Sequence, residues 1–271
     1  MQLSALYIYP VKSLAGIALQ EADVALRGLR YDRRWMLTDT QGQFVTQREI
    51  PEMALIGTAI EGRELVLFNR RKEGDQIRVP LNMQEVVTPK LRAQVWSSRV
   101  TVYSAGNEAD AWLSDRLGHP LRLVALPEQS RRPADGRYAP KGQYVSLADG
   151  FPFLLIGQAS LDDLNQRLTD PVPMDRFRPN LVVTGSAAFA EDGWRDLRIG
   201  NQLFRCVKPC ARCVMTTIDQ QTIQKSAEPL RTLSGYRRNG NKVLFGQNVI
   251  WLGSGTDAVV RVGDSVIPVS E

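Results

Sequence analysis

The feature that most constrains the fold is a succession of short segments in which apolar and polar residues alternate. A period of two is typical of strands with one buried face, and many closely spaced short strands favour barrels or sandwiches over a doubly wound sheet. Turn-forming pairs such as Gln41-Gly42, Gly200-Asn201 and Gly263-Asp264 separate several of these segments. The predicted strands are residues 3–9, 34–38, 43–47, 64–68, 91–96, 99–104, 121–126, 153–156, 181–184, 203–207, 214–219, 243–251, 259–262 and 265–269.

Two other segments have helical spacing. In residues 107–117 the apolar side chains share one face, and Gly118 follows as a C-terminal cap. Residues 160–168 show the same spacing, and Ser160 with Asp163 fits a capping box. The Pro-, Gly- and Arg-rich stretch 127–142 predicts a long surface loop. We therefore predict a mainly β (α+β) fold of two β-barrel-like units, residues 1–125 and 126–271.

Composition excludes several kinds of protein. His119 is the only histidine, so a zinc site with two His ligands is excluded, and its place after Gly118 indicates a turn residue instead of a catalytic base. The chain shows no leader pattern and no apolar run near ~20 residues, so we expect a cytoplasmic protein without membrane contact. The net charge of +5 suits an anionic ligand or an acidic partner. Aromatic residues are 7% and form no stripe among basic residues, which disfavours nucleic-acid binding.

The three cysteines are clustered at Cys206, Cys210 and Cys213. Their C-x3-C-x2-C spacing matches the radical-SAM iron–sulfur signature, but the residues after Cys213 are predicted strands and do not supply that family's barrel of strands and helices. Cys206 stands in a strand pattern, where a free cysteine is usually a buried apolar residue. Arg212 favours a thiolate at Cys213, and a thiolate is a soft ligand for molybdenum, copper or iron. Two structural cysteines at 210 and 213 are the alternative.

Seven sequence blocks, in order along nearly the whole chain, resemble the MOSC family. They are YPVKS (9–13), GLRYDRRW (28–35), VTQR (45–48), FRPN (177–180), PCARCVMTTID (209–219), EPLRTL (228–233) and LFGQN (244–248). The first half is similar to the MOSC N-terminal β-barrel domain and the second half to the MOSC domain. The resemblance is greatest to bacterial relatives of the mitochondrial amidoxime-reducing components. It implies a molybdenum-cofactor-dependent reductase of N-hydroxylated compounds, such as amidoximes, hydroxylamines and N-hydroxylated bases.

The resemblance also implies roles for particular residues. Cys213 matches the family's metal ligand and is the expected catalytic residue, whereas Cys210 matches a cysteine that is not a ligand. The residues that match cofactor-binding positions are Lys12, Ser13, Arg33, Gly150, Phe151, Arg178, Asn180, Ala211, Arg212 and Asn248. Gly150 and Phe151 differ in side chain from the animal enzymes, and Asn248 replaces a Tyr. Because these positions come from both halves, we expect a molybdenum cofactor (Mo-molybdopterin) site at their junction.

Several alternatives remain open at this point. Taken singly, Lys12 or Arg33 is equally well a solvated charge, and Arg178 is equally well paired with Asp175 or Asp162. Longer bacterial relatives carry a ferredoxin domain, which these residues lack, so we expect electrons from a separate ferredoxin-, flavodoxin- or flavoprotein-type donor. MOSC domains also occur in molybdenum cofactor sulfurases, so a sulfur carrier is a second interpretation. No pyridoxal-phosphate domain is evident to generate the sulfur. A cofactor-binding module without turnover is the third interpretation.

Overall fold

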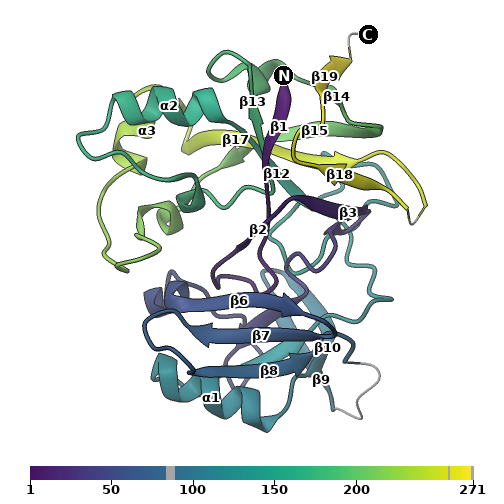
Figure 1. Ribbon diagram of the computed structural model, residues 1–271, viewed down its shortest axis with the longest axis vertical. Helices are drawn as coiled ribbons and strands as arrows, with labels where there is room; N and C mark the ends of the chain where they lie inside the picture. Colours follow the sequence, from purple (N-terminus) through teal and green to yellow (C-terminus); the bar gives the residue numbers. More distant parts are fainter. Residues whose placement is uncertain (84–88, 256, 270–271) are drawn as a thin grey trace.

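Figure 1 shows a two-part molecule, with one large sheet in its upper part and smaller sheets with a helix below. The computed structural model describes residues 1–83, 89–255 and 257–269. Strands dominate these residues, which confirms the expectation of a mainly β fold with few helices. Among them, no helix has the length and apolar character needed to cross a bilayer.

The large sheet has nine strands and combines both ends of the chain (Figure 1). Its order is β19-β14-β15-β17-β12-β13-β1-β2, with β16 beside β17. These strands are β1 (Gln2–Ile8), β2 (Ile17–Leu19), β12 (Phe153–Gly157), β13 (Leu181–Thr184), β14 (Asp196–Ile199), β15 (Gln202–Ala211), β16 (Arg238–Asn239), β17 (Lys242–Trp251) and β19 (Val266–Val269). The first strand, β1, pairs antiparallel with β13.

Three smaller sheets complete the fold. The first has the order β5-β11-β10-β9, from β5 (Trp35–Thr38), β9 (Lys90–Val95), β10 (Ser98–Ser104) and β11 (Arg122–Ala125). The second consists of β6 (Ile56–Glu61), β7 (Glu64–Asn69) and β8 (Gln76–Pro80). The third joins β3 (Glu21–Ala25) and β4 (Gly28–Leu29) to β18 (Val259–Arg261). Strands from both sides of residue 125 therefore share two of the sheets.

The alternating strands bury their apolar faces in separate cores. One core lies against the large sheet, where the rings of Phe153 and Phe204 meet edge to face with their centroids 5.4 Å apart. Another lies between the smaller sheets and α1 (Asn107–Leu117), which buries Leu113 and Leu117. Gly118 ends α1 with a φ of 68° and a backbone bond to Ser114, as the sequence predicted.

Two further helices cover the upper sheet, α2 (Gln158–Gln166) and α3 (Leu230–Tyr236) (Figure 1). The predicted capping box is wrong, because α2 begins at Gln158 and Ser160 lies inside the helix. There the Ser160 hydroxyl bonds the buried carboxylate of Glu191, 2.7 Å away. The sequence pattern did not predict α3.

Two predicted strands are also wrong. Residues 214–219 begin with a 3-10 helix, η4 (Val214–Thr217), in which the Thr216 and Thr217 hydroxyls bond backbone carbonyls three residues earlier. Residues 43–47 form only isolated bridges, to Thr38 and Gln94. The predicted loop 127–142 contains no helix or named strand, as expected.

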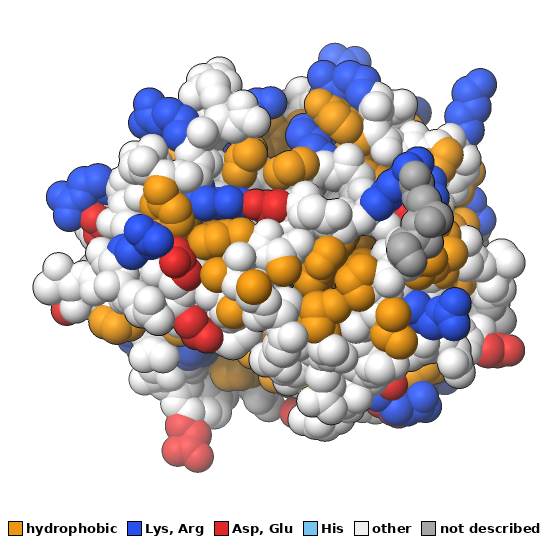
Figure 2. Space-filling model, turned by 90° about the horizontal axis from the view of Figure 1, so that it is seen from above, with side chains coloured by type: hydrophobic (Ala, Val, Ile, Leu, Met, Phe, Trp, Pro, Cys, Tyr) orange, Lys and Arg blue, Asp and Glu red, His pale blue; other side chains and the backbone are white. Residues whose placement is uncertain are grey.

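Figure 2 looks onto the face at the top of Figure 1, where apolar side chains are interspersed with charged ones. The edge strand β19 contributes exposed Ile267 and Val269 on either side of Pro268. Proline has no N–H to offer an incoming strand, which limits edge-to-edge pairing there.

Candidate functional site

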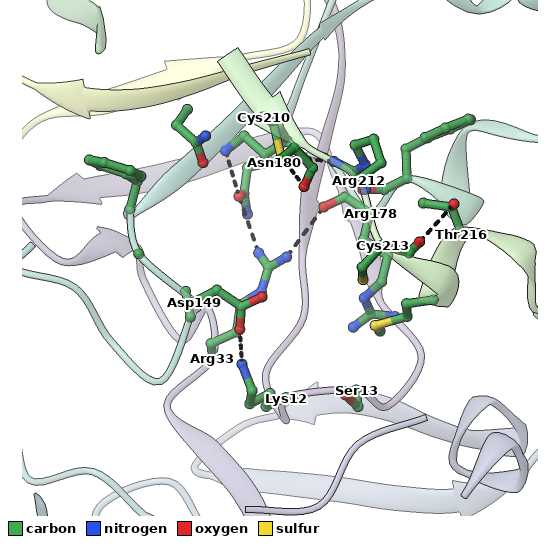
Figure 3. Close-up of a pocket in the computed structure, with 18 of the residues that line it drawn as sticks. Lys12, Ser13, Arg33, Asp149, Arg178, Asn180, Cys210, Arg212, Cys213 and Thr216 are labelled. Carbon is green, nitrogen blue, oxygen red and sulfur yellow. Dashed lines mark hydrogen bonds and ion pairs between the residues drawn. The ribbon is translucent and has the colours of Figure 1, made fainter. Parts of the chain in front are cut away.

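A single pocket brings together all of the predicted site residues (Figure 3). It lies where the loops after β1 and β4 meet the ends of β15 and the loop before β13. Its lining includes Cys213 and the predicted cofactor positions Lys12, Ser13, Arg33, Gly150, Phe151, Arg178, Asn180, Ala211, Arg212 and Asn248. Residues more than 200 positions apart in sequence, such as Lys12 and Cys213, therefore share one cavity.

The lining of the pocket includes an ion pair between Lys12 and Asp149. The Lys12 side chain is 8% exposed, and its ammonium donates to the Leu147 carbonyl at 3.1 Å and to the Asp149 carboxylate. Burial lowers the pKa of Lys12, and Asp149 opposes that effect. Burial raises the pKa of Asp149, but Lys12 and the Trp96 indole N–H outweigh it, so Asp149 stays ionised. The pair places a buried cation beside a charged, solvent-accessible carboxylate.

Two arginines that line the pocket stack on the buried ring of Tyr9. The guanidinium carbons of Arg33 and Arg178 lie 4.3 Å and 4.1 Å from the Tyr9 ring centroid. Asp32 holds Arg33 through two bonds of 2.8 Å and 2.7 Å. Arg178 forms no ion pair with any described carboxylate, and its buried Nη2 has no hydrogen-bond partner there. Burial lowers the pKa of Arg178 to about 10, so the guanidinium stays charged at neutral pH.

Asn180 acts on the pocket by orienting Arg33. Its side-chain oxygen accepts from Arg33 Nη1 at 3.1 Å and from the Leu154 N–H at 3.2 Å. Its side-chain nitrogen donates to the Tyr7 carbonyl at 3.1 Å. The bonds to Leu154 of β12 and Tyr7 of β1 fix the amide of Asn180, and the fixed amide in turn orients Arg33.

Three of the site residues have left-handed backbone conformations. The φ angles are 68° at Ser13, 47° at Arg33 and 57° at Arg178. For a residue with a side chain this conformation costs roughly 1–2 kcal/mol. Such strain persists where the surrounding structure enforces it, and it clusters at functional sites.

The cysteines reach the pocket through irregular backbone. The pairing of β15 with β17 slips between Cys206 and Lys208 and again between Pro209 and Ala211, which bends β15 before Cys210. Cys213 follows in extended conformation, with its carbonyl held by Thr216 and its thiol exposed. Cys206 packs against the core instead, and burial raises its pKa to about 12. Among the described residues there is no cluster of metal-binding side chains of the iron–sulfur or zinc kind.

Arg212 and Asn248 support the bend near Cys210. Arg212 Nη1 donates to the Cys210 sulfur at 3.1 Å and Nη2 to the Phe177 carbonyl at 2.6 Å. Asn248 donates to the carbonyl of Lys208 at 3.2 Å. Gly150 leaves open space, because a Cβ there would meet no atom within 4 Å. The pocket thus combines charged side chains, the Cys213 thiol and open space beside Gly150.

Sequence reasoning missed several other lining residues: Thr46, Arg48, Ala148, Asp149, Arg176, Phe177, Met215 and Thr216. Thr46 and Arg48 lie in the block 45–48, and Asp149 directly precedes Gly150. Their closeness in sequence to predicted site residues is the one signal that could have identified them. Arg132, expected in a surface loop, is buried and donates to the carbonyls of Ser146, Ala148 and Asp149. It fixes the loop that carries Asp149.

Comparison with known proteins assigns the chain to a family. The model of the MOSC N-terminal beta barrel domain matches residues 1–120, and that of the MOSC domain matches residues 142–267. The chain belongs to the MOSC family. The mitochondrial amidoxime-reducing component 1 of Mus musculus is 35% identical over 280 residues, which cover 96% of this chain and 80% of that protein.

Two other MOSC relatives show the range of the family. The mitochondrial amidoxime-reducing component 1 of Xenopus laevis is 33% identical over 99% of this chain and 82% of its own length. The molybdenum cofactor sulfurase of Solanum lycopersicum is 32% identical over 98% of this chain. The chain spans about a third of that sulfurase, since the match covers 35% of its length. Two of these relatives are thus named for amidoxime reduction and one for the molybdenum cofactor.

Proposed function

We propose that this protein is a molybdenum-cofactor-dependent reductase of N-hydroxylated compounds. The observation that carries the proposal is the exposed thiol of Cys213 in a pocket whose other walls hold Lys12, Arg33 and Arg178. A thiolate suits molybdenum, and clustered fixed cations suit the phosphate and pterin of the cofactor. Two of the relatives above are named amidoxime-reducing components.

The residues present fit this cofactor. Arg178 has a buried N–H without a partner among the described residues, which leaves it free to bond an anion. Gly150 also lines the pocket, and the space beside it is open. Lys12, Arg33 and Arg178 would bind the anionic parts, and Cys213 would bind the metal. When bound, the cofactor would supply the two electrons that reduce the N–OH group to the amine, amidine or imine.

Several residues of the chain hold the charged groups and the thiol of the pocket in fixed positions. Asn180 and Asp32 fix Arg33, and Arg132 fixes the loop of Asp149, so the charged groups need little rearrangement when a ligand binds. Arg176 is buried and donates to the Thr216 carbonyl at 3.0 Å, which holds the turn that follows Cys213. The thiol is therefore presented on a rigid turn.

The proposal includes a separate electron donor. The net charge of +5 favours an acidic carrier of the ferredoxin, flavodoxin or flavoprotein type. In this proposal the reaction takes place in the cytoplasm, and its substrates are N-hydroxylated small molecules.

The test uses protein produced with molybdenum cofactor and an artificial donor, reduced methyl viologen. We expect oxidation of the viologen to depend on an added amidoxime, with the amidine as product. Cys213→Ser should abolish turnover and lose molybdenum, whereas the neighbouring Cys210→Ser should retain both. Molybdenum-loaded protein that leaves amidoximes and hydroxylamines unchanged would refute the proposal.

A sulfur-transfer role is the second candidate, because the sulfurase relative matches 98% of this chain. In that case the Cys213 thiol would carry a persulfide for delivery to another protein. Cyanolysis of protein incubated with a persulfide donor, which transfers its outer sulfur to the thiol and leaves as a thiol itself, distinguishes the two functions. Stoichiometric thiocyanate from wild type but not from Cys213→Ser, without amidoxime reduction, would favour sulfur transfer.

A further inference from the structure

A buried pair of glutamine side chains joins the two halves of the chain beside the pocket of Cys213. Gln47 is fully buried, and Gln220 is 6% exposed. The amide nitrogen of Gln47 donates to the amide oxygen of Gln220 at 3.1 Å, and the nitrogen of Gln220 donates back to the oxygen of Gln47 at 3.0 Å. Gln47 lies in the region matched by the MOSC N-terminal domain, and Gln220 lies in that matched by the MOSC domain. The glutamine pair is therefore a direct link between the two matched domains.

Each glutamine also holds backbone next to a residue of the pocket (Figure 3). The amide nitrogen of Gln47 donates to the carbonyl of Ser13 at 2.6 Å, and Ser13 lines the pocket in a left-handed conformation. The amide nitrogen of Gln220 donates to the carbonyl of Ile218 at 3.1 Å. Ile218 directly follows η4, which begins next to Cys213. The glutamine pair thus connects the turn of Ser13 to the turn of Cys213.

The backbone around Gln220 is held as well. Arg70, from the first half of the chain, donates to the carbonyl of Gln220 at 2.7 Å. The preceding residue, Asp219, forms an ion pair of 2.9 Å with Arg176, which lines the pocket. Arg176 in turn donates to the carbonyl of Thr216 at 3.0 Å. The loop after η4 is therefore tied both to the first half of the chain and to the wall that carries Cys213.

The hydrogen bonds of the glutamine pair make it a rigid connection. Each amide nitrogen donates twice, and each amide oxygen accepts from the other glutamine. Such bonds are stronger in a buried site than in water, and a buried amide that loses its partner is left desolvated. A shift of Ser13 relative to Cys213 would break several of these bonds together. Separation of the two pocket walls is therefore opposed by the pair.

We propose that Gln47 and Gln220 are positioning residues that set the spacing between Ser13 and Cys213 for a ligand that contacts both. The inference rests on the proposed function for the identity of that ligand, the molybdenum cofactor. Neither glutamine lines the pocket, so each acts through the backbone that it holds. Because the ligand would be bound from both halves at once, loosening the pair should weaken its binding without altering the chemistry at the metal.

The first test is amide hydrogen exchange of cofactor-free protein, measured in peptides that cover residues 213–220. Gln47→Met keeps a long unbranched side chain but removes the amide. Exchange in these peptides should accelerate by roughly 3- to 10-fold, the range for one net hydrogen bond. The matched control is Gln202→Met at the start of β15, which removes the acceptor of the Trp251 indole N–H. The control should leave exchange in residues 213–220 unchanged.

The second test uses protein produced with molybdenum cofactor. Gln47→Met and Gln220→Met should each purify with less molybdenum and pterin per chain, while KM and turnover per bound molybdenum stay near those of wild type. The double variant should resemble either single variant, because each substitution removes the same mutual bonds. Gln202→Met should retain the cofactor. If Gln47→Met folds poorly, Gln220→Met provides both measurements by itself.

The two tests separate the inference from the proposed function. Unchanged exchange in residues 213–220 of both single variants would overturn the positioning role, whatever the activity. Faster exchange with full molybdenum content would also overturn it, because the ligand would not depend on the spacing. Faster exchange and lower molybdenum content in a protein that leaves amidoximes unchanged would support the positioning role and refute the proposed reaction. A wild type that takes up no molybdenum would refute the proposed function, and the exchange measurement alone would then decide the positioning role.

Discussion

Replacing Arg178 by Gln should change stability and cofactor retention in opposite directions. The pKa of Arg178 falls from 12.5 to about 10 through burial, which corresponds to roughly 3 kcal/mol of unfavourable free energy for the charged form. Loss of the stacking on Tyr9 removes about 1–2 kcal/mol of favourable interaction. The ligand-free variant should therefore gain roughly 1–2 kcal/mol, and its melting temperature should rise by about 2–6 °C.

The cofactor-loaded protein should respond in the opposite way. The unpartnered Nη2 of Arg178 is the donor that we assign to a cofactor anion, and loss of one charge-assisted bond costs about 1.5–3 kcal/mol of affinity. Purified Arg178→Gln should then contain less molybdenum and pterin per chain, while turnover per bound molybdenum changes much less. The assay is metal and pterin analysis beside thermal melting of cofactor-free protein, with Arg99→Gln as the matched control.

One result would refute this reasoning. If Arg178→Gln keeps full molybdenum occupancy and shows a raised KM for the amidoxime, the guanidinium binds substrate. A lower melting temperature of the cofactor-free variant would show that the stack on Tyr9 outweighs the cost of burying the charge.

Three further outcomes are expected. Cys213→Ala should change the free energy of unfolding by less than about 0.5 kcal/mol, because the residue is exposed, and the variant should lose molybdenum. Cys206→Ala should lower the free energy of unfolding by about 1 kcal/mol in urea denaturation, and that variant should keep the metal. Asp149→Asn should destabilise the protein by about 1–3 kcal/mol in the same assay, because Lys12 stays buried without its carboxylate. Arg137 lowers the pKa of Asp135 to about 2, so that contribution to stability is present above pH ~4 and is lost as pH falls toward 2. Asp135→Asn should flatten that part of the pH profile in equilibrium denaturation.

Each of these has a contradicting result. Equal molybdenum loss from the Cys206 and Cys213 variants would point to a metal site that uses both thiols. Wild-type stability of Asp149→Asn would mean that the Leu147 carbonyl suffices for Lys12. An unchanged acid limb in Asp135→Asn would assign acid sensitivity to other carboxylates.

Local sequence patterns predicted the strands whose alternation reflects one buried face. They failed where a side-chain hydrogen bond, to the backbone or to a distant side chain, decides the local structure. The alternation at 214–219 resembles a strand, yet the Thr216 and Thr217 hydroxyls close a 3-10 turn. Ser160 has the sequence environment of a helix cap, but its partner, Glu191, is 31 residues away. Such long-range partners leave no periodic signal.

In the candidate site, too, residues within recognisable sequence blocks were predicted, whereas a residue whose role depends on distant contacts was not. The positions of Lys12, Arg178 and Cys213 followed from blocks that resemble a family, and the structure places them in one pocket. The role of Arg132 did not follow, because its loop has the composition of a solvated segment. Its burial depends on three carbonyls 14 to 17 residues away that only the folded chain brings within reach.

The pairing of β1 with β13 has a consequence for synthesis of the chain. Leu6 of β1 pairs with Leu181 of β13, so the partners lie 181 − 6 = 175 positions apart in the sequence. At about 5–20 residues per second, the ribosome needs roughly 9–35 s to deliver the second strand after the first. The β3 strand waits longer still for β18. The pocket is also unfinished until Asn248 has been made, because that residue forms part of its lining.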